Sequence, residues 1–449
     1  MGEARRDIAR GLASALLAGG WRRSELLFRA ADALGGSGLW LRHLVQDVLA
    51  AFPSPPWDAR DVLARFIFAH EAFQDVWARK WITARLRRWY LDVPEMREPR
   101  WPVRRLNTLG DVSEWLGVFD EQLDGWADRK GLEHTTREPR LQNYRYAWVP
   151  KRSGGARLLE APKSRLKSLQ RRILQDILDT IPPHPAAHGF RQGRSVLTHA
   201  RLHAGQETVL HFDLRAFFAE VHPARAFGVF RATGYPEEVS RTLMGLCTNR
   251  VPLSVLREAP RPTNAREAEA LFHLRRRLAE SHLPQGAPTS PALANLCAFH
   301  LDVRLEELAR SLGVTYSRYA DDLTFSGDRK LAGAAGRLER RVGDIAREEG
   351  FSLNPHKTRV MRAASRQSVT GIVVNQGPNV ARDEFDALKA TLHNCVRHGP
   401  ASQSRGIEHF REHLQGKVAW VEHLNPHRGE TLRRLFDAID WSGLPDPPE

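Results

Sequence analysis

VTYSRYADDLTFS, residues 314–326, is the stretch that decides the fold of this chain. Two alternating runs, 314–319 and 323–326, flank a short polar tip, which is typical of a β-hairpin that presents carboxylates at its turn. Asp321 and Asp322 lie at this tip. Because aspartate also suits ordinary turns, the hairpin alone leaves open whether these acids have a chemical role.

A third acid, Asp213, ends an apolar strand over residues 209–212. An ionised carboxylate at such a place is costly to bury unless it binds a cation or a partner. Paired with Asp321 across neighbouring strands, Asp213 could hold two Mg²⁺ ions, which prefer carboxylate oxygens. Two such ions can activate an attacking hydroxyl and stabilise departing pyrophosphate. The pattern predicts nucleotidyl transfer.

The composition limits the class of protein. The 449 residues carry a formal charge of +14, which favours a polyanionic partner such as nucleic acid, although a merely basic enzyme fits the charge equally well. Cys247, Cys297 and Cys395 are far apart, so neither a disulfide framework nor a zinc pair is expected. With no apolar run long enough for a membrane span, we expect a cytoplasmic protein without membrane contact.

The chain divides by its hydrophobic pattern. Apolar residues at three- and four-residue spacing predict a helical extension over residues 1–135. Short β-like runs (145–149, 208–214, 314–319, 323–326 and 369–374) then alternate with helices, which predicts an α+β core over 136–374. Within it, 251–283 is a charged, helical insertion, for which a solvated helix face is the simpler interpretation. Residues 375–449 are predicted to be helical and basic.

The motifs follow a recognisable order. They are PKRSGGAR at 150–157, LKSLQ at 166–170, HGFRQGRS at 188–195, the Asp213 strand, QGAPTSP at 285–291, YADD at 319–322, GFSLNPHKT at 350–358 and VTGIVVN at 369–375. This series resembles the bacterial retron-type reverse transcriptases. Members of that group also share an Asn-Ala-x-x-His element, which reads here as His199-Ala200-Arg201-Leu202-His203 and so departs at its first position.

The resemblance implies a fold and a set of site residues. It implies a right-hand polymerase with fingers, a palm with an antiparallel sheet and a helical thumb. Asp213, Asp321 and Asp322 would form the catalytic triad that holds two Mg²⁺ ions. The nucleotide-binding residues would be Lys151, Arg157, Phe218, Gln285, Gly286 and Lys357. The RNA- or primer-binding residues would be His199, His203, Val369, Thr370, Gly371, Arg411 and Lys417.

Several of these assignments have a plain alternative. Phe218, at the family's steric gate against ribonucleotides, could be a core phenylalanine. Lys357, a possible general acid for pyrophosphate, could bind phosphate or face solvent. His199 and His203 could be an ordinary pair four residues apart on a helix, since two histidines do not make a zinc site.

The implied function is RNA-directed DNA synthesis in a retron. Such an enzyme copies part of a cognate structured noncoding RNA, which is both template and primer, into single-stranded DNA (msDNA) from dNTPs and leaves a branched RNA–DNA hybrid. An antiphage role with an effector protein follows as a hypothesis. The segment after Val374 is too short for an RNase H domain, so a host RNase H is expected to trim the RNA.

Two other functions stay open on the sequence. One is another bacterial defence-associated or group II-like reverse transcriptase. The other is a non-catalytic RNA-binding protein, against which the intact Asp213, Asp321 and Asp322 argue. The RNA, the priming nucleotide, the effector, the oligomeric state and the role of the extension are not fixed by the sequence.

Overall fold

The structure is a computed structural model that describes residues 2–56, 60–78, 86–90, 95–129, 131–136, 138–151 and 154–442. The chain forms two compact units. Unit 1 comprises Met1–Ile181 and His222–Thr289, and unit 2 comprises Pro182–Val221 and Ser290–Glu449. Arg152 and Ser153 of the PKRSGGAR motif lie outside the described residues.

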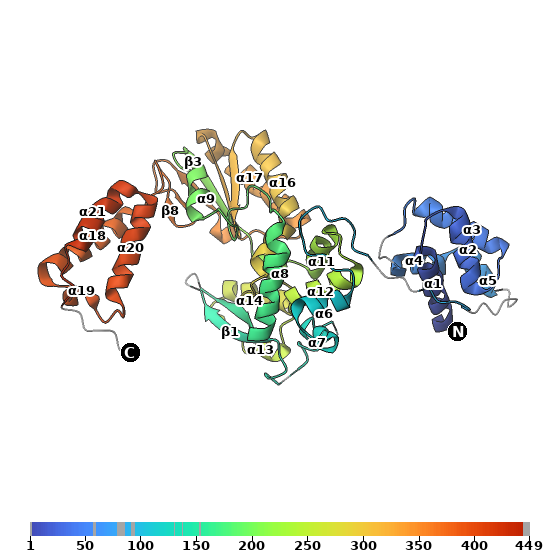
Figure 1. The fold of residues 1–449 in the computed structure, drawn as a ribbon. Helices are drawn as coiled ribbons and strands as arrows, with labels where there is room; N and C mark the ends of the chain where they lie inside the picture. Colours follow the sequence, from blue (N-terminus) through green and yellow to red (C-terminus); the bar gives the residue numbers. More distant parts are fainter. Residues whose placement is uncertain are drawn as a thin grey trace. The chain divides into compact units, whose positions relative to one another are not determined.

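Unit 1 is mostly helical and contains one two-stranded sheet (Figure 1). Its elements are α1 Gly2–Leu17, α2 Arg23–Leu34, α3 Leu39–Ala51, α4 Arg60–Ala69, α5 Glu71–Ala78, α6 Leu109–Leu116, α7 Asp120–Trp126, β1 Tyr144–Pro150, β2 Ala156–Pro162, α8 Ser164–Asp176, η1 Leu178–Thr180, α11 Pro223–Ala232, α12 Glu237–Cys247, α13 Leu253–Arg257 and α14 Ala265–Leu278.

Helices α1–α5 share a core of their own. Leu12, Leu26, Leu44 and other residues at the predicted helical spacing are fully buried in it. Helices α6 and α7 instead contact α12, and Trp115 of α6 donates from Nε1 to Asp176 Oδ2 at 2.8 Å. Within the predicted extension over 1–135, α1–α5 thus share one core, whereas α6 and α7 pack on α12.

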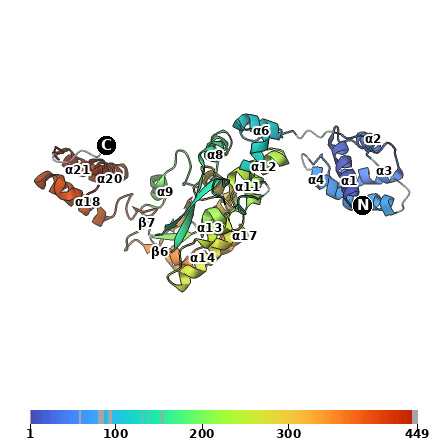
Figure 2. The same ribbon diagram turned by 90° about the horizontal axis from the view of Figure 1, so that it is seen from below.

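The hairpin predicted at the PKRSGGAR motif is present. β1 and β2 pair antiparallel, with Val149 opposite Arg157. Trp148 on β1 donates from Nε1 to the Val255 carbonyl of α13 at 3.1 Å, and Figure 2 shows the hairpin with α13 and α14 beside it.

The charged insertion is helical, as predicted, and its two ends meet. The N–H of Asn249 donates to the carbonyl of His282 and the N–H of His282 to that of Asn249, both at 2.9 Å. Buried Glu160 of β2 accepts from Asn249 Nδ2 at 2.7 Å and contacts His282 Nε2 at 2.9 Å. Burial lowers the pKa of His282, but Glu160 and the Glu280 carbonyl raise it more, with a net increase. The Glu160–His282 contact lies at the base of the insertion.

Unit 2 contains a four-stranded antiparallel sheet in the order β4-β5-β3-β6 and a small β7-β8 sheet. Its elements are α9 Val196–Leu202, β3 Thr208–Asp213, α10 Phe217–Glu220, α15 Ser290–Cys297, α16 Phe299–Ser311, β4 Thr315–Tyr319, β5 Asp322–Gly327, α17 Arg329–Glu348, η2 Pro355–Lys357, β6 Arg359–Arg362, β7 Ser368–Val369, β8 Ile372–Val373, α18 Arg382–His398, α19 Ala401–Ser404, α20 Phe410–Leu424 and α21 Pro426–Asp437.

Alternation along the strands gives the main sheet two faces. His211 and Asp213 of β3 lie opposite Thr324 and Asp322 of β5, so these four residues share one face. Helices α16 and α17 contact β4 and β3 respectively, and Figure 1 shows them side by side. His211, Asp213 and Asp322 therefore lie on one face of the sheet, and Asp213 and Asp322 lie at the end next to the β4–β5 turn.

The run at 369–374 was predicted to be one strand. In the structure it forms a hairpin. β7 and β8 pair through Val369 and Ile372, and Thr370 and Gly371 take positive φ angles of 48° and 86° in the turn. Tight hairpin turns need such angles, and glycine adopts them without strain. This hairpin and helices α18, α20 and α21 share one core that includes Val369, Leu392, Val418 and Leu432.

The mixture of helices with antiparallel sheets agrees with the predicted α+β class. No helix within the described residues has the length and apolar character that a membrane span needs.

Candidate active site

The YADD turn is a two-residue connection between β4 and β5. Tyr319 pairs with Asp322, which leaves Ala320 and Asp321 in the turn. The sequence predicted that Asp322 lies at the tip of the hairpin. In the structure it is the first residue of β5. Ala320 has a φ of 55°, and a Cβ added to Gly189 would lie 2.7 Å from its backbone nitrogen. The backbone at Gly189 packs directly against the YADD turn, so a side chain at position 189 would displace the turn.

The third acid joins this turn through backbone pairing. Asp213 lies directly opposite Asp322, not opposite Asp321 as predicted. The N–H of Leu214 donates to the carbonyl of Asp321 at 2.9 Å. The sheet register and this hydrogen bond bring the three predicted catalytic acids together.

Asp213 is 3% exposed and is balanced by a cation of the protein itself. Lys357 Nζ lies 2.6 Å from Asp213 Oδ2, and Asn354 donates from Nδ2 to Asp213 Oδ1 at 3.3 Å. Burial lowers the pKa of Lys357, but the hydrogen bond and charge of Asp213 raise it more, with a net increase. Lys357 is therefore protonated at neutral pH and neutralises Asp213.

Asp321 has a strongly raised pKa. Burial first, and then the charges of Asp322 and Asp213, raise the pKa of Asp321 to about 6. His211 Nε2 lies 3.0 Å from Asp322 Oδ1. Burial lowers the pKa of His211, but Asp322 raises it more, so the imidazole gains affinity for a proton beside the acids.

A divalent cation fits these residues. The donors are carboxylate oxygens, which Mg²⁺ prefers. Burial and the charges of Asp322 and Asp213 disfavour the ionised form of Asp321, so a bound cation would stabilise that form. As the side chains stand, no three His, Cys, Asp or Glu groups in the described part of the chain converge on one point. Lys357 contacts Asp213 Oδ2, so an ion that binds this oxygen would take the place of the ammonium.

A buried ion pair supports the turn from the other face of the sheet. Arg318, fully buried, donates to both oxygens of Asp302 on α16, at 2.8 and 2.6 Å. Its third donor, Nη1, bonds to the Ala320 carbonyl at 3.0 Å and to Asn295 Oδ1 at 2.9 Å. The guanidinium also lies over the ring of Phe217 at 5.5 Å. Arg318 thus ties α16 to the YADD turn.

His199 and His203 do not form an RNA-binding surface in this structure, because both side chains are 0% exposed. The two nitrogens of His203 lie 2.7 Å from the hydroxyls of Ser317 on β4 and Ser326 on β5. The ring of His199 lies 5.8 Å from that of Tyr319. We therefore revise the prediction for both residues from RNA contact to support of the hairpin.

Phe218 lies close to the acids in sequence and is only partly buried. Its ring centroid is 5.7 Å from that of Phe217 and 6.0 Å from that of Phe190. The buried position belongs to Phe217, which is 4% exposed. The alternative of a core phenylalanine thus describes Phe217 rather than Phe218.

Four predicted nucleotide-binding residues belong to unit 1. Lys151 and Arg157 are exposed on the β1–β2 hairpin. The Gln285 carbonyl accepts from the Glu160 N–H at 2.9 Å. Gly286 has a φ of 138°, and a Cβ there would lie 2.8 Å from the Glu160 carbonyl oxygen, so only glycine fits beside β2.

The remaining predicted RNA-binding residues lie in the β7–β8 hairpin and on α20. Val369 is 1% exposed and belongs to the core, so it does not contact RNA directly. Gly371 is exposed at the turn, and Thr370 is half-buried. Arg411 and Lys417 are exposed on α20, and the Arg411 guanidinium lies 5.6 Å from the centre of the Trp441 ring.

The sequence interpretation missed three residues around the acids. His211 could have been found from strand alternation, because it precedes Asp213 by two positions and shares its face. Asn354 and Arg318 carried no such signal, since their partners Asp213 and Asp302 are brought near only by the fold.

Comparison with known proteins decides the family. Residues 149–388 match the model of the reverse transcriptase (RNA-dependent DNA polymerase) family. The chain is 44% identical to the retron Mx65 reverse transcriptase of Myxococcus xanthus, over 73% of this chain and 70% of that protein. The chain belongs to the retron-type reverse transcriptases.

Further relatives agree. Identity is 37% with the retron Mx162 reverse transcriptase of Myxococcus xanthus, over 79% of this chain and 72% of that protein. It is 32% with the retron Ec86 reverse transcriptase of Escherichia coli, over 78% and 93%. This retron-type reverse transcriptase is an RNA-directed DNA polymerase with the right-hand fold of its family, which uses divalent metal ions, a template RNA and nucleotides.

Proposed function

We propose that this reverse transcriptase copies part of a cognate structured noncoding RNA into single-stranded DNA, primes from a 2′-hydroxyl of that RNA and leaves a branched RNA–DNA hybrid. The observation that carries the proposal is the joining of Asp213, Asp321 and Asp322 by β3–β5 pairing and the Leu214–Asp321 hydrogen bond, in a chain whose relatives are named retron enzymes. An antiphage role with an effector protein, and trimming of the RNA by a host RNase H, belong to the same proposal.

We propose that two Mg²⁺ ions, when bound by the three acids, supply the positive charge that activates the primer hydroxyl and stabilises pyrophosphate. Lys357 forms an ion pair with Asp213 and would balance its charge before the ions and nucleotide arrive. Its raised pKa makes it a weak acid in this state, so charge compensation of the phosphates is a better role for it than proton donation. Lys151 and Arg157 would hold the triphosphate from the fingers hairpin, with Gln285 and Gly286 lining the nucleotide pocket.

The domain assignment is part of this proposal. Residues 136–374 would form fingers and palm, with 251–283 inserted, and residues 375–449 a helical thumb. In that thumb, exposed Arg411 and Lys417 on α20, together with the Thr370–Gly371 turn, would hold the RNA. Helices α1–α5 have their own core, which suits an accessory element of the complex.

The test expresses the protein with its flanking DNA and examines total nucleic acid on a denaturing gel with and without RNase A. We expect a discrete single-stranded DNA whose mobility changes on RNase treatment, and no such DNA from the Asp321→Asn/Asp322→Asn variant. A long heterogeneous product that depends on the same acids would support the polymerase assignment and exclude the branched retron product. Product from the double variant would refute the site.

Phe218→Ala is expected to admit ribonucleotides. A bulky ring against the sugar C2′ excludes a 2′-hydroxyl, and shape discrimination of this kind is worth about 10- to 200-fold. The ratio of kcat/KM for dCTP to that for CTP should fall by this factor. Phe299→Ala, which changes a 39% exposed phenylalanine on α16, should leave the ratio unchanged, and an unchanged ratio in Phe218→Ala would remove the gate assignment.

A further inference from the structure

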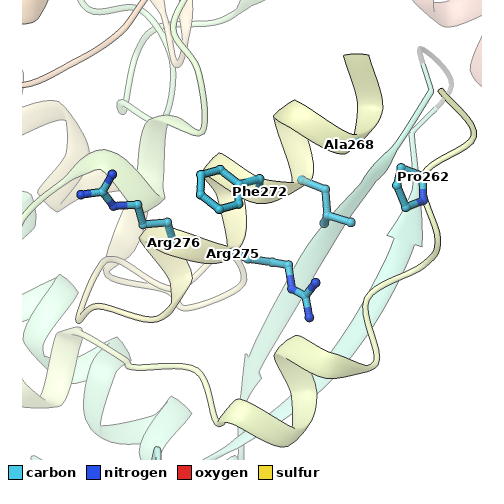
Figure 3. A pocket seen from close by; sticks show the side chains of 6 residues that line it. Pro262, Ala268, Phe272, Arg275 and Arg276 are labelled. Carbon is cyan, nitrogen blue, oxygen red and sulfur yellow. The ribbon is translucent and has the colours of Figure 1, made fainter. Parts of the chain in front are cut away.

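The charged insertion carries a cavity of about 430 Å³ that the polymerase mechanism does not use. It is lined by Pro262, Ala268, Leu271, Phe272, Arg275 and Arg276. Phe272 is 64% exposed. Figure 3 shows its ring between the side chains of Arg275 and Arg276.

The chemistry of this cavity is apolar with a cationic rim. None of its lining residues is acidic. Among the described residues, no carboxylate lies within ion-pair distance of Arg275 or Arg276. A ring flanked by two arginines that lack a carboxylate partner is complementary to a base attached to a phosphodiester, because bases stack on aromatic rings and phosphates pair with guanidinium groups.

The cavity also belongs to the part of the chain that handles nucleotides in the proposed function. Glu267, on the same helix, accepts from the N–H of Gly155 at 3.1 Å. Gly155 lies in the loop of the β1–β2 hairpin that carries Lys151 and Arg157. Helix α14 is thus attached to the fingers hairpin within unit 1.

We propose that the α14 cavity binds single-stranded nucleic acid, with one base stacked on Phe272 and the neighbouring phosphates held by Arg275 and Arg276. Ala268, Leu271 and Pro262 form the apolar floor under the base. The volume lies within the range of small-molecule sites, roughly 300–1,000 Å³, and accommodates a nucleobase. The inference rests on the proposed function, since it assumes that the enzyme carries an RNA and a growing DNA strand.

The test measures binding of short fluorescent oligouridine RNA and oligothymidine DNA to the full-length protein over a series of KCl concentrations. Phe272→Ala is expected to weaken binding about 5- to 100-fold, the usual effect of removing one stacked base, and Phe272→Tyr to restore it. Arg275→Ala/Arg276→Ala should make the negative slope of log affinity against log salt shallower by about 1.4. The reason is that two phosphate contacts to a single strand are removed.

Matched controls separate this surface from general effects of charge and aromatic area. Arg340→Ala/Arg341→Ala removes an adjacent exposed pair on α17, and Phe119→Ala removes a phenylalanine that is 74% exposed. Both should bind like the unmodified protein. Losses confined to RNA would assign the cavity to the template RNA, and equal losses for RNA and DNA would assign it to either strand.

Unchanged oligonucleotide binding in Phe272→Ala and in the double arginine variant would overturn the proposal, even if the same variants lost a protein partner. Extension of a preannealed primer–template measures the polymerase separately. We expect the α14 variants to retain it at saturating substrate, so failure of the cavity is distinguishable from failure of the proposed function.

Discussion

Asp321→Asn/Asp322→Asn is expected to reduce DNA synthesis by at least about a thousandfold, because removing even one preorganised electrostatic group from an active site costs about 10²–10³ in rate. Both side chains are replaced by amides of equal size, so the hairpin keeps its shape. Incorporation of labelled dNTP on a preannealed primer–template measures the loss. Asp344→Asn, which changes an exposed acid on α17, is the matched control and should be fully active.

The same site predicts an opposite effect on stability. The pKa of Asp321 rises from 3.8 to about 6 in the folded protein, so the fold disfavours the ionised form. The resulting penalty is absent below about pH 4 and complete above about pH 6. In EDTA, Asp321→Asn should therefore unfold at a higher temperature than the unmodified protein above pH 6 and at the same temperature below pH 4.

Magnesium should reverse this order. Added Mg²⁺ should raise the unfolding temperature of the unmodified protein, because a ligand that binds only the folded state stabilises it, and should leave the double variant unchanged. An Asp321→Asn protein that is less stable than the unmodified one in EDTA at pH 7 would contradict the electrostatic account of the site.

Asp302→Ala is expected to cost about 3–5 kcal/mol in unfolding free energy, the usual effect of leaving a buried charge without its partner. Arg318 and Asp302 are both 0% exposed, so water cannot replace the lost carboxylate. The Ala320 carbonyl depends on the same guanidinium, and primer extension should fall with stability. Urea unfolding of the full chain measures the first effect and dNTP incorporation the second.

An exposed pair provides the control for this prediction. Asp344→Ala breaks the ion pair with Arg347, whose side chain is 75% exposed, and should cost no more than about 1 kcal/mol. Asp302→Leu/Arg318→Met should recover part of the stability lost in Asp302→Ala, since it removes both charges. Equal losses in Asp302→Ala and Asp344→Ala would show that the buried pair does not support the turn.

The sequence predicted well what local pattern controls. Alternation located β3 and the β4–β5 hairpin, because a half-buried strand repeats every two residues. The ends of the elements were less accurate: Asp322 pairs with Tyr319 and belongs to β5, and the 369–374 run bends at Thr370 and Gly371. A pattern of residue types does not distinguish an extended run from two strands joined by a two-residue turn.

The sequence did not predict which polar residues are buried. His199 and His203 have the spacing of an exposed helical pair, yet both are buried against the hairpin. Arg318 gave no sign of its role, because its partner lies on another element. Whether a polar side chain faces solvent, a ligand or a buried partner depends on contacts between elements, which a single sequence does not display.

The backbone hydrogen bonds between Asn249 and His282 place the start and the end of the insertion next to each other. The segment between them leaves and rejoins the rest of unit 1 at one hydrogen-bonded pair, so residues can be added within it without separating Asn249 from His282. Insertions are best tolerated where entry and exit points are adjacent. A foreign domain inserted between α13 and α14 should therefore leave this pairing in place, together with the hydrogen bonds that join these helices to Trp148 and Gly155.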